Sequence, residues 1–297
     1  MNALLSARQL SLEPRLHDIS LDVERGQVLG LLGINGAGKS TLLAALAGVQ
    51  PCDSGEILID GQPLHGQRAL RRRVGWLPQR PPIYPDMSVI ENLRFAARLR
   101  MPGAAVSQAQ LDEALQQYQL APLQRRLAHR LSGGEAMRLG LACCLIHQPD
   151  VLLLDEPSAG LDPLQAEQLR ALIGALAGER AVVIASHLLP DIEQLCSRAL
   201  LLHDGRILAE EPVHDARPLM LAEFSHVPED SALLAIPGIA RVVAREAGQV
   251  IVELQADAPP IMPEKLACHG WGLRRWQPAP NDLAARFRRI SSGEAIS

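Results

Sequence analysis

The stretch GINGAGKS at residues 33–40 constrains the fold more than any other part of this 297-residue chain. It fits the pattern G-x-x-x-x-G-K-[ST], in which backbone N–H groups wrap phosphate oxygens where the chain bends tightly from a strand into a helix. The flanks suit this geometry, because the apolar run QVLGLLG leads into the turn and the apolar run LLAALAG follows it. We therefore predict a phosphate-binding loop between a strand and a helix.

The residue types in this loop indicate its chemistry. Lys39 is expected to reach the β- and γ-phosphates of a nucleotide, and the hydroxyl of Ser40 to bind Mg²⁺. Thr41 lies where its hydroxyl or its N–H group can reach the α-phosphate. The predicted phosphate-binding residues are Asn35, Gly36, Ala37, Gly38, Lys39, Ser40 and Thr41.

A second motif, VLLLDEP at residues 151–157, ends in two adjacent carboxylates. The continuous apolar run is typical of a strand that is buried on both faces of a parallel sheet. Asp155 at its end can help to hold Mg²⁺, and Glu156 can polarise an attacking water molecule. Two acidic residues at a strand end would mean little alone, but beside a phosphate loop they predict a hydrolytic site.

Composition narrows the class of protein. A hydrophobic fraction of 47% is enough for a large core, and the net charge of −4 produces no general attraction to nucleic acid, so no nucleic-acid partner is expected. No window approaches the roughly 18 apolar residues of a membrane span, and the first residues do not resemble a signal peptide. The five scattered cysteines form no C-x-x-C pair, which argues against a disulfide framework or a zinc site and favours a reducing cytoplasm.

Apolar patterning predicts an α/β domain over residues 1–218 and a small α+β domain over residues 219–297. Short strands and turns fill the first part of the chain, and a helical subdomain is expected at about residues 86–147. Strands are then expected at VLLLDEP, at AVVIAS and in the hairpin ALLLHDGRILAEE. In the second domain we expect paired strands, a helix at 262–268, a strand near 271–276 and a helix from Asn281, an order that suits a ferredoxin-like arrangement.

A second anion site is predicted at LSGGE, residues 131–135. Ser132 is a suitable N-cap, and Gly133 and Gly134 leave the first helical turn without side chains. Such a helix start offers unpaired N–H groups and the positive end of the helix dipole. The chain therefore holds two potential phosphate sites, and its own patterning does not explain why.

Further motifs resemble those of the nucleotide-binding subunits of ABC ATPases, and they occur in that family's order over roughly residues 4–213. Gln79 in VGWLPQ resembles the Q-loop, LSGGE the signature sequence, Asp162 in SAGLD the D-loop, and His187 in IASHL the switch histidine. The resemblance implies ATP and Mg²⁺ as ligands, with Gln79 near the metal and His187 beside the γ-phosphate. Lys39, Gln79, Glu156 and His187 are then the expected catalytic residues, and Ser40, Gln79 and Asp155 the expected metal-binding residues.

The resemblance also offers a reason for two anion sites. In ABC ATPases two subunits dimerise head to tail, so that Ser132, Gly133 and Gly134 of one close over the γ-phosphate bound by Lys39 of the other. Asp162 would join the same composite site. A homodimer or a heterodimer that closes on ATP and opens after hydrolysis is therefore expected.

Two positions depart from the family pattern. Glu135 stands where the signature usually has Gln, which adds negative charge near a phosphate and predicts somewhat weaker closure. The family usually stacks adenine on an aromatic ring before the phosphate loop, but this chain has no aromatic residue before Trp76. The matching position lies near Leu12, and Arg15 or His17 could cover the base instead. We therefore expect loose base selection, with GTP competing against ATP.

A single nucleotide domain without a membrane span implies a separate transmembrane permease, and a location on the cytoplasmic face of the cell membrane. The stretch PPIYPDMSVIENLRFAARLR resembles the ATPases of exporters, and Tyr84 and Met87 are expected to contact the permease. The segment after Pro218 resembles appendages that regulate exporter ATPases or help them to dimerise, although a purely stabilising role fits equally. The alternative class is a soluble ABC ATPase that remodels a macromolecular assembly. Against it, the chain lacks a second nucleotide domain, a long coiled coil and a zinc motif.

Overall fold

The computed structural model describes residues 3–101, 103, 106–213, 219–246, 248–255 and 262–279. The chain divides into two compact units, Met1–Val213 and His214–Ser297. The helix predicted from Asn281 lies outside the described residues, as does Pro218, where the sequence suggested a domain boundary.

A six-stranded sheet forms the centre of the first unit, in the order β10-β9-β3-β8-β7-β6. Strands β9, β3, β8, β7 and β6 run parallel, and β10 pairs antiparallel with β9 at one edge. Every residue of β3, β7 and β8 is buried, as the continuous apolar runs predict. The bounds are β3 Val28–Leu32, β6 Val74–Leu77, β7 Val151–Asp155, β8 Ala181–Ala185, β9 Arg198–His203 and β10 Arg206–Pro212.

A second sheet of the first unit is antiparallel, in the order β2-β1-β4-β5. Its strands are β1 Leu5–Leu12, β2 Leu16–Val23, β4 Ser54–Ile59 and β5 Gln62–Pro63. The sequence pattern did not reveal β1, because a register shift between Ala7 and Leu10 and a left-handed Gln9 (φ 46°) interrupt its apolar alternation. Both sheets and the first helix contribute to one core, which includes Leu5, Leu42 and Val183.

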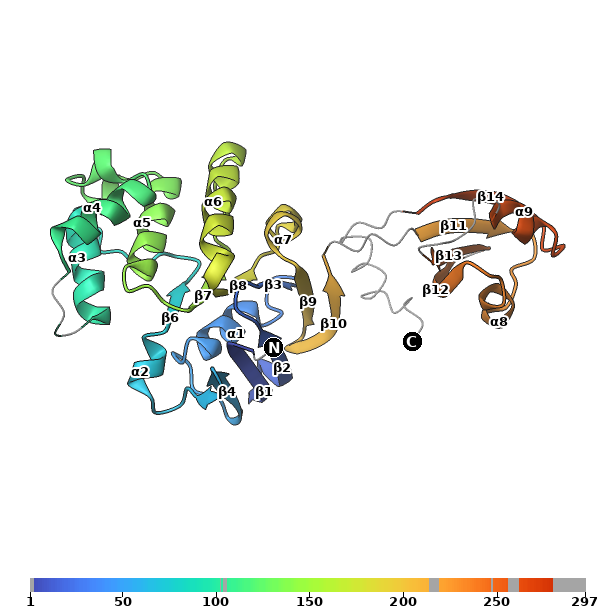
Figure 1. Cartoon of the computed structure of the whole chain (residues 1–297), viewed down its shortest axis with the longest axis horizontal. Coiled ribbons are helices and arrows are strands. Elements are labelled where there is room, and N and C mark those ends of the chain that lie inside the picture. Colours follow the sequence, from blue (N-terminus) through green and yellow to red (C-terminus); the bar gives the residue numbers. More distant parts are fainter. Residues whose placement is uncertain are drawn as a thin grey trace. The chain divides into compact units, whose positions relative to one another are not determined.

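Side chains cap several helices of the first unit, and the N-cap predicted at Ser132 is among them. Capping boxes begin three of them, at Ser88, Ser107 and Ser132, and Asp162 caps a fourth through its side chain. Figure 1 shows α3, α4 and α5 grouped beside the central sheet, in the span expected to be a helical subdomain. The helices are α1 Lys39–Leu46, α2 Arg68–Arg71, α3 Val89–Arg100, α4 Gln108–Gln117, α5 Gly133–Leu145, α6 Pro163–Leu176 and α7 Leu189–Leu195, with short 3₁₀ turns at Ala121–Leu123, Ala128–Arg130 and Ala177–Glu179.

The second unit has the element order βαββαβ in its described residues. Its antiparallel sheet has the order β12-β13-β11-β14, so the first strand lies between the third and the fourth, as in ferredoxin-like folds. Apolar residues including Phe224, Val252 and Leu266 form its core. The elements are β11 Leu219–Phe224, α8 Asp230–Leu234, β12 Ile239–Glu246, β13 Gln249–Leu254, α9 Met262–Ala267 and β14 Leu273–Pro278. The predicted α/β fold with an α+β appendage is confirmed.

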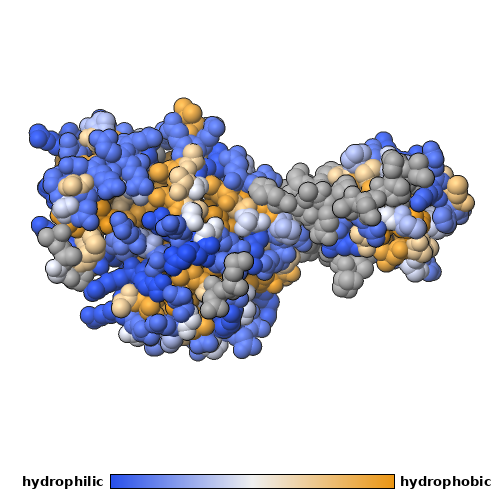
Figure 2. Space-filling view, in the orientation of Figure 1, coloured by the Kyte–Doolittle hydropathy of each residue, from blue (hydrophilic) through white to orange (hydrophobic). Residues whose placement is uncertain are grey.

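Figure 2 shows hydrophilic and hydrophobic residues interspersed over the visible face of each unit. Among the helices of the described residues, none combines the length and the apolar character that crossing a bilayer requires.

Candidate functional site

The sheet order brings four of the predicted motifs to one edge. The phosphate loop follows β3, Gln79 follows β6, Glu156 follows β7 and His187 follows β8. Because these strands are parallel, all four segments leave the sheet at its carboxyl edge, where α/β proteins bind ligands.

The phosphate loop has the backbone that an anion site needs. Gly38 caps α1 in the left-handed region (φ 105°), and α1 has neither a side-chain cap nor an acidic residue in its first turn. A Cβ atom on Gly33 would lie only 2.3 Å from the carbonyl oxygen of Leu202, so a larger residue would push the loop off the sheet. The start of α1 is thus open to an external acceptor, as phosphate binding requires.

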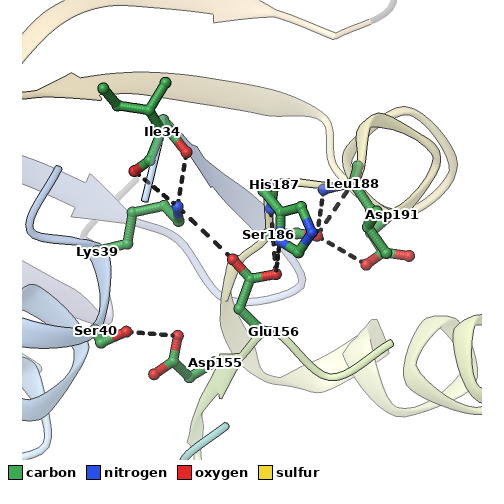
Figure 3. Close-up of polar contacts among 10 residues, drawn as sticks. Ile34, Lys39, Ser40, Asp155, Glu156, Ser186, His187, Leu188 and Asp191 are labelled. Carbon is green, nitrogen blue, oxygen red and sulfur yellow. Dashed lines mark hydrogen bonds and ion pairs between the residues drawn. The ribbon is translucent and has the colours of Figure 1, made fainter. Parts of the chain in front are cut away.

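Lys39 is held above the loop, and its side chain is only 6% exposed. Its Nζ atom donates to the carbonyl oxygens of Gly33 (2.7 Å) and Ile34 (3.3 Å) and lies 3.7 Å from Oε1 of Glu156 (Figure 3). An ammonium group with three donors on a flexible stem can bind phosphate oxygens at this position.

The proposed metal-binding groups also meet here. Ser40 Oγ donates to Asp155 Oδ1 at 3.1 Å, so a hydroxyl and a carboxylate from distant parts of the chain are adjacent. Burial raises the pKa of Asp155, whereas the hydrogen bond from Ser40 lowers it; the charge of Glu156 raises it further. Within the described ranges no group of three or more His, Cys, Asp or Glu residues could hold a metal. The pair fits Mg²⁺, which is often bound by one or two protein oxygens together with nucleotide phosphates.

Gln79 has a different arrangement from these two residues. Its backbone N–H group donates to Asp155, and the residue itself is exposed. Its side chain stays a predicted metal ligand.

Glu156 lies between Lys39 and His187. Its Oε2 atom accepts from the backbone N–H of His187 (3.2 Å) and lies 2.6 Å from Nδ1 of the same residue. A carboxylate partner makes Nδ1 the protonated ring nitrogen, which leaves Nε2 as the acceptor of a neutral ring. Glu156 itself has a left-handed backbone (φ 50°), a strained conformation that is concentrated at functional sites.

The LSGGE turn is built separately from this cluster. Ser132 Oγ accepts from the N–H of Glu135 (3.3 Å), and Glu135 Oε2 accepts from the N–H of Ser132 (2.7 Å). Arg126 Nη1 lies 3.6 Å from Glu135 Oε1. The backbone hydrogen bond from Ser132 is the main factor that lowers the pKa of Glu135, and the cations of Arg126 and Arg138 lower it further. The carboxylate of Glu135, which stands where the family usually has Gln, is therefore held at the start of its own helix and next to the cation of Arg126.

Ser132, Gly133 and Asp162 face solvent or are partly exposed, whereas Gly134 is buried. Asp162 Oδ1 accepts from the N–H of Gln165 at 2.9 Å. Across the described part of the chain, no hydrogen bond or ion pair joins this group to the phosphate loop. One chain thus brings Lys39, Ser40, Asp155, Glu156 and His187 together and keeps the second anion site apart.

The residues near the expected base position differ in their availability. Leu12 is buried at 6% exposure and cannot cover a base. Arg15 is exposed, and its carbonyl oxygen lies 3.1 Å from the position of a Cβ atom on Gly38. His17 pairs with Glu13 at 3.3 Å. Of the three, Arg15 is next to the loop and free to extend over a nucleotide.

Comparison with known proteins identifies the family. The model of the family described as "ABC transporter" matches residues 16–159. The methionine import ATP-binding protein MetN of Caulobacter vibrioides is 32% identical over 249 residues, which are 78% of this chain and 73% of that protein. The chain belongs to the ABC transporter family.

Other members of the ABC family extend the comparison. The Nod factor export ATP-binding protein I of Cupriavidus pinatubonensis is 38% identical over 67% of this chain and 62% of that protein. The solved structure of cbiO1 from Clostridium perfringens, part of the cbiONQ transporter complex, superposes with a TM-score of 0.63 at 28% identity, over 71% of this chain and 89% of that one. The curated relatives are matched over 34% to 73% of their own lengths.

ABC membership supports ATP binding and ATP hydrolysis by the first unit, as the motifs predict. It also identifies the fold as that of an ABC ATPase domain. The direction of transport is not decided by it, because the relatives include proteins named for import and for export.

Sequence reasoning missed the polar residues behind His187. Ser186 and Asp191 are completely buried, and Arg170 of α6 pairs with Asp191. The sequence offered only a weak indication of this polar cluster, namely a serine directly before His187 and one aspartate in the first turn of the following helix.

Proposed function

We propose that this chain is the ATP-hydrolysing subunit of an ABC exporter and that it drives a separate transmembrane permease. The observation that carries the proposal is the convergence of Lys39, Ser40, Asp155, Glu156 and His187 at one sheet edge, while the LSGGE turn stays apart and exposed. Half of an ATP site is complete in one chain, and the other half faces outward.

The roles proposed for the residues follow from their positions. Lys39 and the N–H groups at the start of α1 bind the phosphates, and His187 contacts the γ-phosphate from the other side. Mg²⁺ held by Ser40 and Asp155, with Gln79 nearby, would neutralise charge on the β- and γ-phosphates. Glu156 accepts a proton as a water oxygen forms its bond to the γ-phosphorus and the bond from that phosphorus to the bridging oxygen breaks.

Two copies, or one copy and a related subunit, are proposed to complete each site. The Ser132–Gly134 turn and Asp162 of one subunit would then face the γ-phosphate that Lys39 of the other subunit binds. This arrangement is supported by the exposure of Ser132 and Gly133, since a helix start attracts anions through its positive dipole end. ATP would favour the closed dimer and hydrolysis would release it.

A groove on the helical group offers a place for the permease. It has a volume of about 220 Å³ and is lined mainly by apolar residues of β6, the segment after it, α3 and α5, together with the polar side chains of Asn92 and Arg100. Tyr84 lines it and is 47% exposed, with its ring 4.8 Å from that of Phe95 in an edge-to-face arrangement. Leu99 on the same groove is 62% exposed. We propose that a short apolar segment of the permease occupies this groove; Met87, the second expected contact, is not among its lining residues.

We further propose a direction of transport, a location of the protein in the cell and a role for its second unit. Export is supported by the resemblance around Tyr84 to exporter ATPases and by a relative named for Nod factor export. We also propose that the protein is located on the cytoplasmic face of the membrane, because it would be bound there to the permease. For the second unit we propose a regulatory or dimerising role, which would explain a separately packed fold after the ATPase domain.

The test is a pull-down of tagged Glu156→Gln protein from detergent-solubilised membranes with ATP and Mg²⁺. A multispan membrane protein in stoichiometric amount would support the transporter assignment, and its loss in Lys39→Ala protein would show that the capture depends on nucleotide. Recovery of soluble partners alone, from membranes shown to hold intact permeases, would favour the alternative of an ATPase that remodels a macromolecular assembly.

A further inference from the structure

A buried polar cluster lies directly behind the switch histidine. Ser186 precedes His187 at the end of β8, and Asp191 lies in the first turn of α7 (Figure 3). Both residues are 0% exposed, so neither can contact a nucleotide. A fully buried carboxylate such as that of Asp191 destabilises the fold unless it is paired and hydrogen-bonded, so its partners must compensate for the loss of water.

The cluster fixes the backbone on both sides of the histidine. Ser186 Oγ donates to Asp191 Oδ2 at 2.9 Å and accepts from the N–H of Leu188 at 3.0 Å. The N–H of Ser186 donates to the carbonyl oxygen of Leu31 in β3, the strand that leads into the phosphate loop. His187 therefore sits in a short turn whose preceding and following residues are both held by one hydroxyl.

Arg170 completes the cluster from a different helix. Its Nη1 atom donates to Asp191 Oδ1 at 3.1 Å, and its Nε atom donates to Gln194 Oε1 at 2.8 Å. The side chain of Arg170 is 13% exposed and that of Asp191 is 1% exposed, so the ion pair is nearly dry. A buried pair of this kind adds little net stability over an apolar pair of the same shape, but breaking it leaves an uncompensated charge, so it holds its two helices in one arrangement.

We infer that Asp191 is a positioning residue for His187, held in place by Arg170 and acting through Ser186. The inference rests on the proposed function, since it concerns the histidine expected beside the γ-phosphate. It also gives α6 a specific role, because this helix is capped at its start by Asp162, a predicted part of the subunit interface, and carries Arg170 two turns later. A change at the interface end of α6 would reach His187 through the Arg170–Asp191 pair.

The first experiment compares Asp191→Asn with Asp150→Asn in the full chain. Asp150 pairs with Arg73 and Arg25 and precedes β7, at the opposite end of the sheet, so its substitution also removes an ion-paired carboxylate. We expect Asp191→Asn to lower kcat by about tenfold or more, with KM for ATP little changed, because a small displacement of a catalytic group costs rate rather than binding. Asp150→Asn should leave both constants unchanged. Equal losses of kcat in the two variants, or none in Asp191→Asn, would overturn the inference.

The second experiment asks whether Asp191 acts through the histidine. In a His187→Ala background, Asp191→Asn should have no further effect on single-turnover hydrolysis, since the group it positions is gone. A further loss by the same factor as in the wild type would show an independent structural effect. Arg170→Lys keeps the charge but not the planar fork, so its rate of ATP hydrolysis should lie between those of the wild type and Asp191→Asn. It replaces Asp191→Asn as the test variant if that protein fails to fold.

The third readout needs no turnover. In ¹⁵N-histidine spectra, the His187 signals, assigned by their loss in His187→Ala, should shift or broaden in Asp191→Asn and stay in place in Asp150→Asn. Unmoved His187 signals would overturn the positioning role. A wild-type protein that does not hydrolyse ATP in complex with its permease would instead refute the proposed function, and the spectra would still decide whether Asp191 orients the histidine.

Discussion

The phosphate loop and the LSGGE turn both place glycine at a helix start, and they differ in what satisfies that start. At the phosphate loop, α1 has no side-chain cap, Lys39 forms a buried ion pair with Glu156, and the buried Asp155 accepts a hydrogen bond from Ser40. At the LSGGE turn, α5 is capped in both directions by Ser132 and Glu135, and the turn is largely exposed.

This difference shows how the two halves of the proposed composite site are prepared. The phosphate loop depends on remote strands for its surroundings, so its geometry is set by the fold of one subunit. The LSGGE turn is stabilised locally, because the capping box of Ser132 and Glu135 holds its backbone in place without any ligand. In the proposed composite site, the phosphate loop is organised to bind ATP and the LSGGE turn to close over it. Substitutions can therefore perturb each half separately.

The largest effect is expected at the phosphate loop. Lys39→Ala should reduce ATP binding and turnover by about a hundredfold or more. Among the described residues, Lys39 is the only buried cation that is bonded to the loop carbonyls, and the substitution removes it. Binding of a fluorescent ATP analogue and phosphate release would measure this. Lys265→Ala, at the chain's other lysine, is the matched control and should behave as the wild type. Normal turnover in Lys39→Ala would refute the site.

A nearly equal loss of turnover is expected at Glu156, but with a different consequence. Glu156→Gln should slow hydrolysis by about 10²- to 10⁴-fold while leaving ATP bound, since the amide cannot take a proton from water. The ATP-bound dimer should then accumulate, as measured by light scattering after size exclusion, preferably in complex with the permease. A variant that stays monomeric in that complex under saturating ATP would contradict the composite site, and Lys39→Ala/Glu156→Gln should not dimerise.

A smaller effect should separate the charge of Glu135 from its capping role. Glu135→Gln keeps an acceptor for the N–H of Ser132 and removes one negative charge, so ATP-driven dimerisation should strengthen a few-fold. Because the pKa of Glu135 is lowered below its ordinary value of 4.5, the stability that its charge contributes is present at neutral pH.

That contribution should be lost as the pH falls below 4.5 through the folded-state pKa. The melting temperature of the wild type relative to Glu135→Gln should therefore decline over this range and level off at lower pH. A difference that is constant between pH 6 and pH 3 would show that the charge contributes nothing to the helix start.

The smallest effect concerns the base. With Leu12 buried and no aromatic residue before Trp76, Arg15 is the exposed side chain next to the phosphate loop, and a guanidinium stacks on purines with little discrimination. GTP should compete with ATP within about tenfold in a displacement assay, and Arg15→Ala should weaken both nucleotides to a similar degree. A strong preference for adenine in the wild type would exclude this view of the base site.

Local motifs could be predicted from the sequence because their geometry depends on neighbouring residues. The turn at 33–40 and the N-cap at Ser132 form where the pattern indicates. Strand β1 was missed because its left-handed Gln9 breaks the alternation on which strand prediction rests. The ferredoxin-like order of the second unit was suggested by its element sequence and needed the strand pairings to establish it.

The sequence by itself determined the chemical groups of this ATPase, since a lysine after glycines, an Asp–Glu pair after an apolar strand and a serine before two glycines are short-range features. Only the tertiary structure decided which of these groups meet. Ser40 reaches Asp155 across 115 positions, and Arg170 reaches the buried Asp191 from another helix. The physical reason is that such contacts depend on strand order and helix packing, which arise from the burial of many apolar side chains at once and are not encoded in any single stretch of the chain.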